Sequence, residues 1–242
     1  MPWPFYGNLN TPMRISDVRR GRHLRTALLR SGVALGMLAI GPVSASAADP
    51  PLTRVVGPSF GAESASAEAR RIAAWVIESD DNGTLPFIIV DKINAKAFAF
   101  DQQGLLLGAA PVLLGLARGD TSPDGIGNRK LSSISPAERI TPAGRFVAAL
   151  GENLGGKGIL WVDYDAAISL HRVDTAKPEE RRLQRLATQS ILDNRISYGC
   201  INVPVHFYEE VVASLFEGTG GIVYILPETR SVEGGFFAKP QS

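Results

Sequence analysis

Cysteine is nearly absent from this chain of 242 residues, in which it occurs once, as Cys200. A single cysteine excludes an intrachain disulfide framework and a zinc site built on cysteine pairs. A surplus of one charge sign is also missing, because 25 Lys+Arg face 24 Asp+Glu, and this balance gives no reason to expect nucleic acid as a partner. What is abundant is apolar residues, at 45%, with 25 glycines and 16 prolines. This composition predicts a packed, turn-rich fold and favours β-structure over a helix bundle.

The first 47 residues are expected to comprise an N-terminal extension and a segment with the composition of a secretory signal peptide. Six arginines lie between residues 14 and 30, an uncharged apolar run follows at 31–43, and Ala45-Ser46-Ala47 fits the small-x-small cleavage rule. The apolar run is shorter than the roughly 20 residues that span a bilayer, so we expect cleavage and no membrane span afterwards. Residues 1–47 contain six of the 25 Lys+Arg and one of the 24 Asp+Glu. Residues 48–242 therefore contain 19 Lys+Arg and 23 Asp+Glu, so we expect a mildly acidic exported domain.

The rest of the chain has the size of one domain. We expect a linker and a packing helix at 48–85, the main domain at 86–227 and a tail at 228–242. A polar loop at 115–139 is long enough to suggest a functional role. The strands and helices form a mainly β fold with helical decorations, a β-sandwich or partly closed barrel. Apolar patterns predict strands at 87–90, 95–100, 105–114, 145–150, 159–164, 166–171 and 222–226, and helices at 63–78, 178–188 and 204–217.

Cys200 is the strongest candidate for chemistry, since a lone cysteine in an exported protein is a reactive thiol or an intermolecular staple. Gly199 allows a sharp turn and a close approach to the thiol. A helix predicted from Pro204 would place Cys200 just before a helix N-terminus, which favours a thiolate. An ordinary thiol has a pKa of about 8.5, so a nucleophilic cysteine needs a base or a cation nearby.

Two histidines follow residue 47, and either one is a candidate base. His171 ends a predicted strand, which is a rigid platform, and we favour it. His206 falls in the first turn of the helix after Cys200 and is expected to face solvent. A metal site made of His171, Cys200 and His206 is a weaker alternative, because no carboxylate-bearing motif supports it.

Two segments resemble a known family. Ser-Tyr-Gly-Cys-Ile-Asn at 197–202, with His171 upstream, resembles the catalytic signature of the L,D-transpeptidase (YkuD-type) domain, a His followed by Ser/Thr-x-Gly-Cys-apolar-Arg/Asn. Thr-Pro-Ala-Gly-Arg-Phe at 141–146 resembles the family's Thr-Pro-x-Gly-x-Phe strand motif. The resemblance spans roughly residues 86–227.

The resemblance implies a periplasmic cysteine acyltransferase with a YkuD-like fold and no metal or cofactor. Cys200 would attack a meso-diaminopimelate carbonyl of a peptidoglycan stem tetrapeptide and pass the acyl group to an acceptor amine. His171 would take the thiol proton, and the backbone N–H groups of Gly199 and Cys200 would hold the oxyanion. The cross-link would join two diaminopimelate residues (3,3) or L-Ala to diaminopimelate (1,3), and carbapenems would acylate the thiol.

Several residues near the motif are candidates for binding substrate. Tyr198 stands where many members have His. Arg172, where many have Gly or Ser, would bind a carboxylate or face solvent. Asn202 would brace the cysteine loop rather than touch substrate. Ser197 and Arg195 are further candidates, and Arg145 is a weaker one. The turn acids Asp163, Asp165 and Asp174 are candidates for binding an ammonium group. The aromatic residues Trp161 and Tyr164 are more typical of packing than of a binding site.

The segment between His171 and Cys200 is 28 residues long, more than is usual in the family. The charged helix around 178–187 accounts for the excess. It is either a solvated helix, with i,i+4 pairs such as Glu180–Gln184, or a lid over the cleft.

Two other functions remain open. Water replacing the acceptor amine would give an L,D-carboxypeptidase or an enzyme that cuts protein–peptidoglycan links. A non-catalytic domain that binds cell wall would instead have an unreactive Cys200 that lies away from His171.

Overall fold

The computed structural model describes residues 58–234 and residue 236. The predicted signal peptide, its cleavage site and residues 48–57 of the linker lie outside this range. The expected packing helix is α1 (Ala67–Ser79), which begins where the Ser66 side chain accepts a hydrogen bond from the Ala69 N–H. Ile72 and Val76, with Ala69 and Ala73, form the buried stripe of this helix.

Eight strands form one sheet, and hydrogen bonds at Leu113 bring its two edges together. Leu113 exchanges both backbone hydrogen bonds with Asn202, so the chain just after β3 meets β9 and the sheet becomes a nearly closed barrel. The predicted mainly β fold with helical decorations is thereby confirmed. The strand order is β3 (Leu106–Pro111), β2 (Lys96–Phe100), β1 (Phe87–Asp91), β10 (Gly221–Ile225), β5 (Gly144–Glu152), β6 (Gly158–Asp163), β7 (Ile168–Arg172) and β9 (Ile201–Val203).

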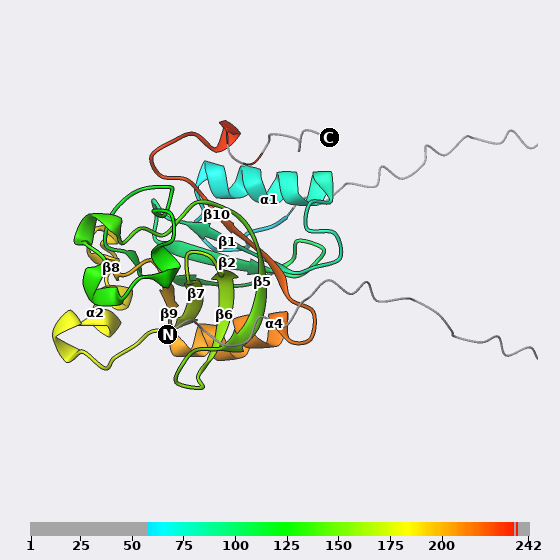
Figure 1. Cartoon of the computed structure of the whole chain (residues 1–242). Helices are drawn as coiled ribbons and strands as arrows, with labels where there is room; N and C mark the ends of the chain where they lie inside the picture. Colours follow the sequence, from blue (N-terminus) through cyan, green and yellow to red (C-terminus); the bar gives the residue numbers. More distant parts are fainter. Residues whose placement is uncertain (1–57, 235, 237–242) are drawn as a thin grey trace, which may run out of the picture. The chain divides into compact units, whose positions relative to one another are not determined.

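The barrel wall is apolar on both faces because helices cover it from both sides. Phe87 and Ile89 of β1 pack with α1, whereas Ile88 and Val90 face the interior. The interior also receives Phe207, Tyr208, Val212 and Phe216 of a continuous helical segment, made of α3 (Val205–Phe207), a π-helical stretch (Tyr208–Ala213) and α4 (Ser214–Phe216). Figure 1 shows α1 and α4 on opposite sides of the strands. Each fully buried Leu, Ile or Phe contributes about 1.5–3 kcal/mol.

Two expected elements differ from the prediction. The helix expected at 178–188 is interrupted by Arg181, whose left-handed backbone (φ 50°) separates a 3₁₀ turn at Pro178–Glu180 from α2 (Arg182–Ala187). Glu180 therefore pairs with Arg182 at 2.6 Å, and the expected pairing with Gln184 along one helix is absent. The loop at 115–139 contains three 3₁₀ turns, which are Ile126–Asn128, Leu131–Ser133 and Pro136–Glu138.

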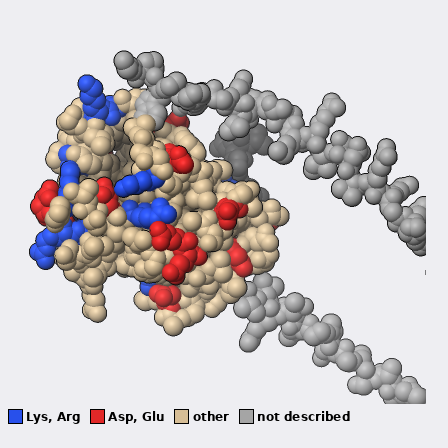
Figure 2. Space-filling view, turned by 90° about the horizontal axis from the view of Figure 1, so that it is seen from below, with Lys and Arg blue, Asp and Glu red and all other residues tan. Residues whose placement is uncertain are grey.

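The residues expected to form a tail from 228 begin inside the fold. The Glu228 carboxylate is 1% exposed and forms an ion pair with Arg195, and Phe236 is buried with the residues under α1. Among residues 58–234, no helix is long and apolar enough to cross a membrane. On the face shown in Figure 2, basic and acidic side chains lie next to one another, so this face has no continuous surface of one charge sign.

Candidate active site

Parallel pairing of β7 with β9 brings His171 and Cys200 together. The register places His171 opposite Asn202, and Cys200 is the residue immediately before β9. The expectation that Cys200 directly precedes a helix N-terminus is wrong, because residues 201–203 are an extended strand and the helix begins at Val205. These residues are extended because β9 bonds to β7 on one edge and to Leu113 on the other.

The His171 ring is oriented by its own strand. Its Nδ1 lies 2.7 Å from the Arg172 carbonyl oxygen, which only accepts, so Nδ1 carries the proton and donates. The other nitrogen, Nε2, then faces the Asn202 side chain at 3.4 Å and is the nitrogen free to receive a proton.

His171 and Cys200 shift each other's titration in opposite directions. Burial opposes the thiolate, but hydrogen bonding to His171, its positive charge and hydrogen bonds from Ser169 outweigh burial and lower the pKa of Cys200. Burial likewise opposes the imidazolium, yet interaction with Cys200 and the hydrogen bond to the Arg172 carbonyl raise the pKa of His171. The Ser169 Oγ donates to the Cys200 Sγ over 3.6 Å. Together these directions favour a thiolate–imidazolium pair.

Alkylation of Cys200 should therefore begin at lower pH than alkylation of an ordinary thiol. Because the pKa of Cys200 is lowered, the thiolate persists as the pH falls below the usual thiol range, and iodoacetamide should react several-fold faster at pH 7 than with a free cysteine peptide. The measurement is the rate of alkylation against pH. Ser169→Ala should move the midpoint upward, and a wild-type midpoint at or above about 8.5 would contradict the pairing.

The turn before Cys200 requires glycine. Gly199 has a φ of 132°, and a Cβ there would lie 2.7 Å from both the Ile140 carbonyl oxygen and the Ile168 Cδ1. Ser197 closes the turn from inside, since its Oγ donates to the Cys200 carbonyl at 2.6 Å and accepts from the Gly199 N–H at 3.1 Å. Ser197 is buried, so the structure places it as a brace of the turn rather than on a substrate surface.

These contacts bear on the expected oxyanion donors. The Gly199 N–H already donates to Ser197, so the expectation that it holds an oxyanion conflicts with the geometry. The Cys200 N–H, in contrast, donates to no acceptor within residues 58–234. The backbone donor left for an oxyanion is therefore that of Cys200 itself.

Thr141 is a site residue that sequence reasoning did not single out. Its buried hydroxyl donates to the Gly199 carbonyl at 2.7 Å and accepts from the Gly115 N–H at 2.8 Å. The sequence pattern predicts only a strand motif at 141–146, and the signal available for this role is a threonine just before a proline. The motif thus supports the cysteine turn directly.

Thr141→Val should keep the side-chain volume but remove both hydrogen bonds. The Gly199 carbonyl and the Gly115 N–H would be left buried and unpaired, at about 1–3 kcal/mol of unfolding free energy. We expect turnover to fall about tenfold as the cysteine turn loosens. Urea unfolding measures the loss of stability, and kcat measures the loss of turnover. Thr141→Ser should restore stability and turnover, and Thr219→Val serves as a control at an exposed position. Unchanged stability and kcat in Thr141→Val would contradict this role of Thr141.

Asn202 lies behind the pair and links it to the insertion. Its side-chain nitrogen lies 3.4 Å from the His171 Nε2 and 3.5 Å from the Cys200 carbonyl, and its oxygen accepts from the Arg182 Nη1 at 2.6 Å. The charge of Arg182 also acts to lower the pKa of His171. Leu186 of the same segment is buried with Leu113 and Val173. The insertion is therefore docked on the fold, with Arg182 one residue away from the histidine.

Three predicted substrate-binding arginines have partners elsewhere in the protein, and only the pair of Arg195 is buried. Arg172 donates to Glu209 at 2.9 Å and to the Gly158 carbonyl, and it lies over the Tyr208 ring. Arg195 forms a two-point ion pair with Glu228, with its Nη2 2.5 Å from the Oε2. Arg145 pairs with Asp81 at 2.6 Å, at the end of α1. The structure does not bring any of these three guanidinium groups to the thiol.

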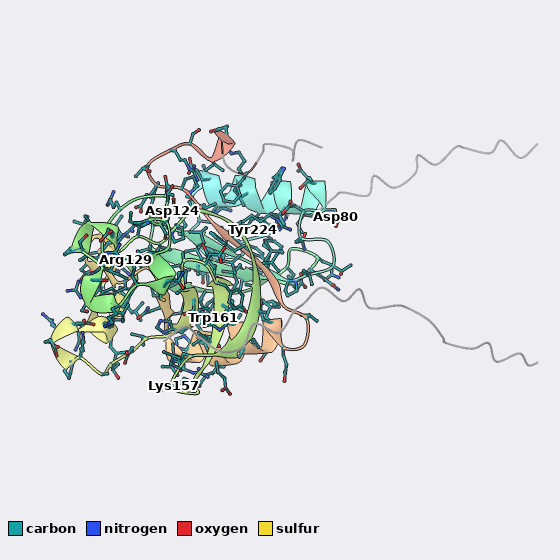
Figure 3. The ribbon with its side chains drawn as sticks, in the orientation of Figure 1. Asp80, Asp124, Arg129, Lys157, Trp161 and Tyr224 are labelled. Carbon is teal, nitrogen blue, oxygen red and sulfur yellow. The ribbon has the colours of Figure 1, made fainter. Side chains whose placement is uncertain are left out.

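Tyr198 does lie beside the thiol. The two residues line a hollow of about 80 Å³, and the Arg139 guanidinium sits over the Tyr198 ring at 3.9 Å. The loop at 115–139 also contributes to the lining of this hollow, including Arg129, which Figure 3 labels. His206 is exposed on α3, and among the described residues no group of three or more His, Cys, Asp or Glu side chains could hold a metal ion.

Comparison with known proteins gives similarity to solved structures. No protein-family model matches the chain, and no curated protein matches it. The solved structures include Pgp2, the helical cell shape determining protein of Campylobacter jejuni (14% identity, 65% of this chain, 55% of that chain, TM-score 0.40). They also include the catalytic domain of the Enterococcus faecium L,D-transpeptidase (19% identity, 59% of this chain, 98% of that chain, TM-score 0.32). A third is the L,D-transpeptidase of Xylanimonas cellulosilytica (13% identity, 59% of this chain, 60% of that chain, TM-score 0.35).

The chain spans little more than half the length of Pgp2. One similar structure is the L,D-transpeptidase LdtMt1 in complex with imipenem (13% identity, 58% of each chain, TM-score 0.33). At these identities function has to be inferred from the residues of the Cys200 site.

Proposed function

We propose that this protein is an L,D-transpeptidase of peptidoglycan that acts in the periplasm through a cysteine nucleophile. One observation carries the proposal, namely that the parallel pairing of β7 with β9 brings His171 and Cys200 into one site, where their interaction lowers the pKa of the thiol and raises the pKa of the imidazole. Perturbed, paired titratable groups beside a hollow are typical of covalent catalysis. The sequence around the pair, Ser-Tyr-Gly-Cys-Ile-Asn, is the segment that resembles the family's signature.

In the proposed acylation half, His171 moves the protons. His171 Nε2 takes the thiol proton, and the Cys200 sulfur attacks the diaminopimelate carbonyl of the donor tetrapeptide. The Cys200 N–H donates to the oxyanion, while Thr141 and Ser197 hold the turn that positions this amide. His171 then gives its proton to the departing amine of the terminal D-amino acid, which leaves a thioester on Cys200.

The second half reverses these roles. The acceptor amine attacks the thioester carbonyl, His171 receives a proton as the C–N bond forms, and the thiolate leaves as the C–S bond breaks. The kinetics are therefore ping-pong. A thiolate of this kind would also open the strained ring of a carbapenem and retain it as an acyl-enzyme.

Product analysis tests the proposal. Purified protein and its Cys200→Ala variant are incubated with tetrapeptide muropeptides, and products are read by tandem mass spectrometry. We expect a dimer that requires Cys200, and its fragments distinguish a 3,3 from a 1,3 bond. A tripeptide without dimer would indicate a carboxypeptidase, and no product in either sample, with an ordinary thiol pKa, would indicate a non-catalytic domain.

A further inference from the structure

The segment between β7 and β9 reaches back to the catalytic pair through one side chain, Arg182 of α2. The Arg182 Nη1 donates to the Asn202 Oδ1 at 2.6 Å, and its Nε donates to the Glu180 carboxylate at 2.6 Å. The left-handed backbone of Arg181 turns the chain between Glu180 and Arg182, so that residues only two positions apart form an ion pair. The Arg182 side chain is 13% exposed, so solvent screens these contacts little.

The contact with Arg182 decides which way the Asn202 amide faces. A guanidinium only donates hydrogen bonds, so the amide atom beside it is the oxygen. The amide nitrogen then points away from Arg182 and lies 3.4 Å from the His171 Nε2 and 3.5 Å from the Cys200 carbonyl oxygen. Asn202 is fully buried, so bulk water does not compete for its amide. The amide is therefore held with an N–H group toward the histidine.

An N–H group at this position favours one protonation state of the His171 ring. A neutral Nε2 has a lone pair that faces the Asn202 N–H group, whereas a protonated Nε2 carries a hydrogen of its own there. An amide turned by 180° would instead present its oxygen, which accepts from the imidazolium. A hydrogen-bond donor that favours the neutral form of a group opposes its charged form. The fixed amide therefore makes the imidazolium a better proton donor than a freely turning amide would.

The charged groups around the His171 ring come from three elements. Cys200, on the turn before β9, favours the imidazolium, and so does the hydrogen bond to the Arg172 carbonyl. The Arg172 guanidinium, on the strand of the histidine itself, pairs with Glu209 at 2.9 Å. From α2, the charge of Arg182 opposes the imidazolium. This charge and the amide that Arg182 orients act in the same direction, so a test has to separate the two.

We propose that Arg182 is a positioning residue, which fixes the Asn202 amide with its N–H group toward His171 and so helps the histidine to release its proton. The inference rests on the proposed function, in which His171 gives that proton to the departing amine of the donor. The proton passes from Nε2 to the amine nitrogen as the C–N bond breaks, and no bond to Arg182 or Asn202 forms or breaks. The insertion thus takes part in the reaction through this relay of hydrogen bonds.

The first test measures the pKa of His171 without turnover. Cys200→Ala removes the thiol, and the imidazole signals of His171 are followed by NMR as the pH changes. Adding Arg182→Met should raise the pKa of His171 by about half a unit or more, because the cation and the fixed amide are both lost. Lys177→Met removes a mostly exposed cation from the same segment and should leave the pKa unchanged. An unchanged pKa in the Arg182→Met protein would overturn the proposal.

A double-mutant cycle separates the orientation of the amide from the charge of Arg182. Asn202→Leu has a similar volume but no amide, so Arg182→Met should raise the pKa of His171 by less than half as much in this background. Equal shifts in the two backgrounds would show that the charge acts through space, which would overturn the relay.

A further measurement covers the case in which the buried Asn202→Leu substitution prevents folding. Hydrogen exchange of the Asn202 side-chain N–H group with solvent should be several-fold faster in Arg182→Met than in Lys177→Met. Equal exchange rates would contradict a fixed amide.

Turnover distinguishes this inference from the proposed function on which it rests. With the tetrapeptide donor, kcat of Arg182→Met should fall about three- to tenfold. The alkaline limb of its pH profile should move to higher pH, because the imidazolium then keeps its proton to higher pH. A lower kcat with an unmoved limb would indicate a merely structural role and would overturn the proposal. If the pKa of His171 responds as expected but no donor acylates Cys200, the proposed reaction fails while the relay stands.

Discussion

Cys200→Ala should abolish turnover of the tetrapeptide and leave the fold intact. Without the sulfur there is no acyl-enzyme, so we expect kcat to fall by on the order of 10⁴-fold or more. The side chain is half-buried and small, and its truncation removes one sulfur atom beside a hollow that already exists. The unfolding free energy should therefore change by about 1 kcal/mol or less. Muropeptide turnover and urea unfolding of the same sample separate the two effects.

His171→Ala should show whether the histidine activates the thiol. Interaction with His171 lowers the pKa of Cys200, so its removal should slow iodoacetamide alkylation at pH 7 as well as turnover. His206→Ala is the matched control, because His206 is exposed on the helix that follows β9. Equal alkylation rates in wild type and His171→Ala would show that the two residues do not act as a pair. Loss of turnover with unchanged alkylation would leave His171 a role in proton transfer to the substrate alone.

The strands that sequence reasoning found are those with enough length to show a pattern. Residues 87–90 are a continuous apolar run because α1 covers one face of β1 and the barrel interior covers the other. The strands expected at 95–100 and 105–114 are present, and they pair antiparallel as β2 and β3. β8 (Arg195–Ser197) and β9 have three residues each, which is too short for a periodicity to appear in the sequence. That omission is why the helix at Val205 was expected to follow Cys200 directly.

The supports of the site depend on contacts between distant segments, which spacing alone does not reveal. Thr141 reaches Gly199 across 58 residues, and Lys92 reaches Thr141 across 49. No glycine or asparagine next to Arg181 indicates its left-handed backbone in the sequence. Arg181 nevertheless ends the 3₁₀ turn and directs Arg182 toward Asn202. His171 and Cys200 were named from residue type and from their places beside strands, and the parallel pairing that joins them is a property of the folded sheet.

The links behind the pair suggest why the insertion is attached to the site. Asn202 contacts His171 and the Cys200 carbonyl on one side and Arg182 on the other. Arg182 is held in turn by Glu180 at 2.6 Å, so the orientation of the Asn202 amide is set by an ion pair outside the barrel. An amide fixed in this way presents its nitrogen, not its oxygen, to His171 Nε2. The charged segment thus orders the site from behind, in addition to any contact with substrate.

Lys92→Met should destabilise the fold more than any other single substitution considered above. The Lys92 side chain is fully buried, and its Nζ donates to the Gly119 carbonyl at 2.5 Å, to Asp120 at 2.9 Å and to the Thr141 carbonyl at 2.9 Å. The Glu228 carboxylate lies 3.6 Å away. Removing the Lys92 cation leaves the carboxylates of Asp120 and Glu228 buried without their positive partner, which should lower the unfolding free energy by about 3–5 kcal/mol. A whole domain is stable by about 5–15 kcal/mol, so this loss should be plain in urea unfolding.

A matched surface variant and the pH dependence separate this cluster from a general effect of lost charge. Lys96→Met removes a partly exposed ion pair with Glu63 and should cost about 1 kcal/mol or less. Burial opposes ionisation of Asp120, but hydrogen bonds from Thr229 and Lys92 outweigh it and lower its pKa. The folded pKa thus lies below the unfolded one, and Asp120 adds stability at neutral pH that disappears as the pH falls through the acid range. The stability that is lost on acidification should be smaller in Lys92→Met than in wild type, and it should be unchanged in Lys96→Met. Because Lys92 also holds the Thr141 carbonyl, a loss of stability without any loss of Cys200 reactivity would show that the cluster supports the fold and not the cysteine turn.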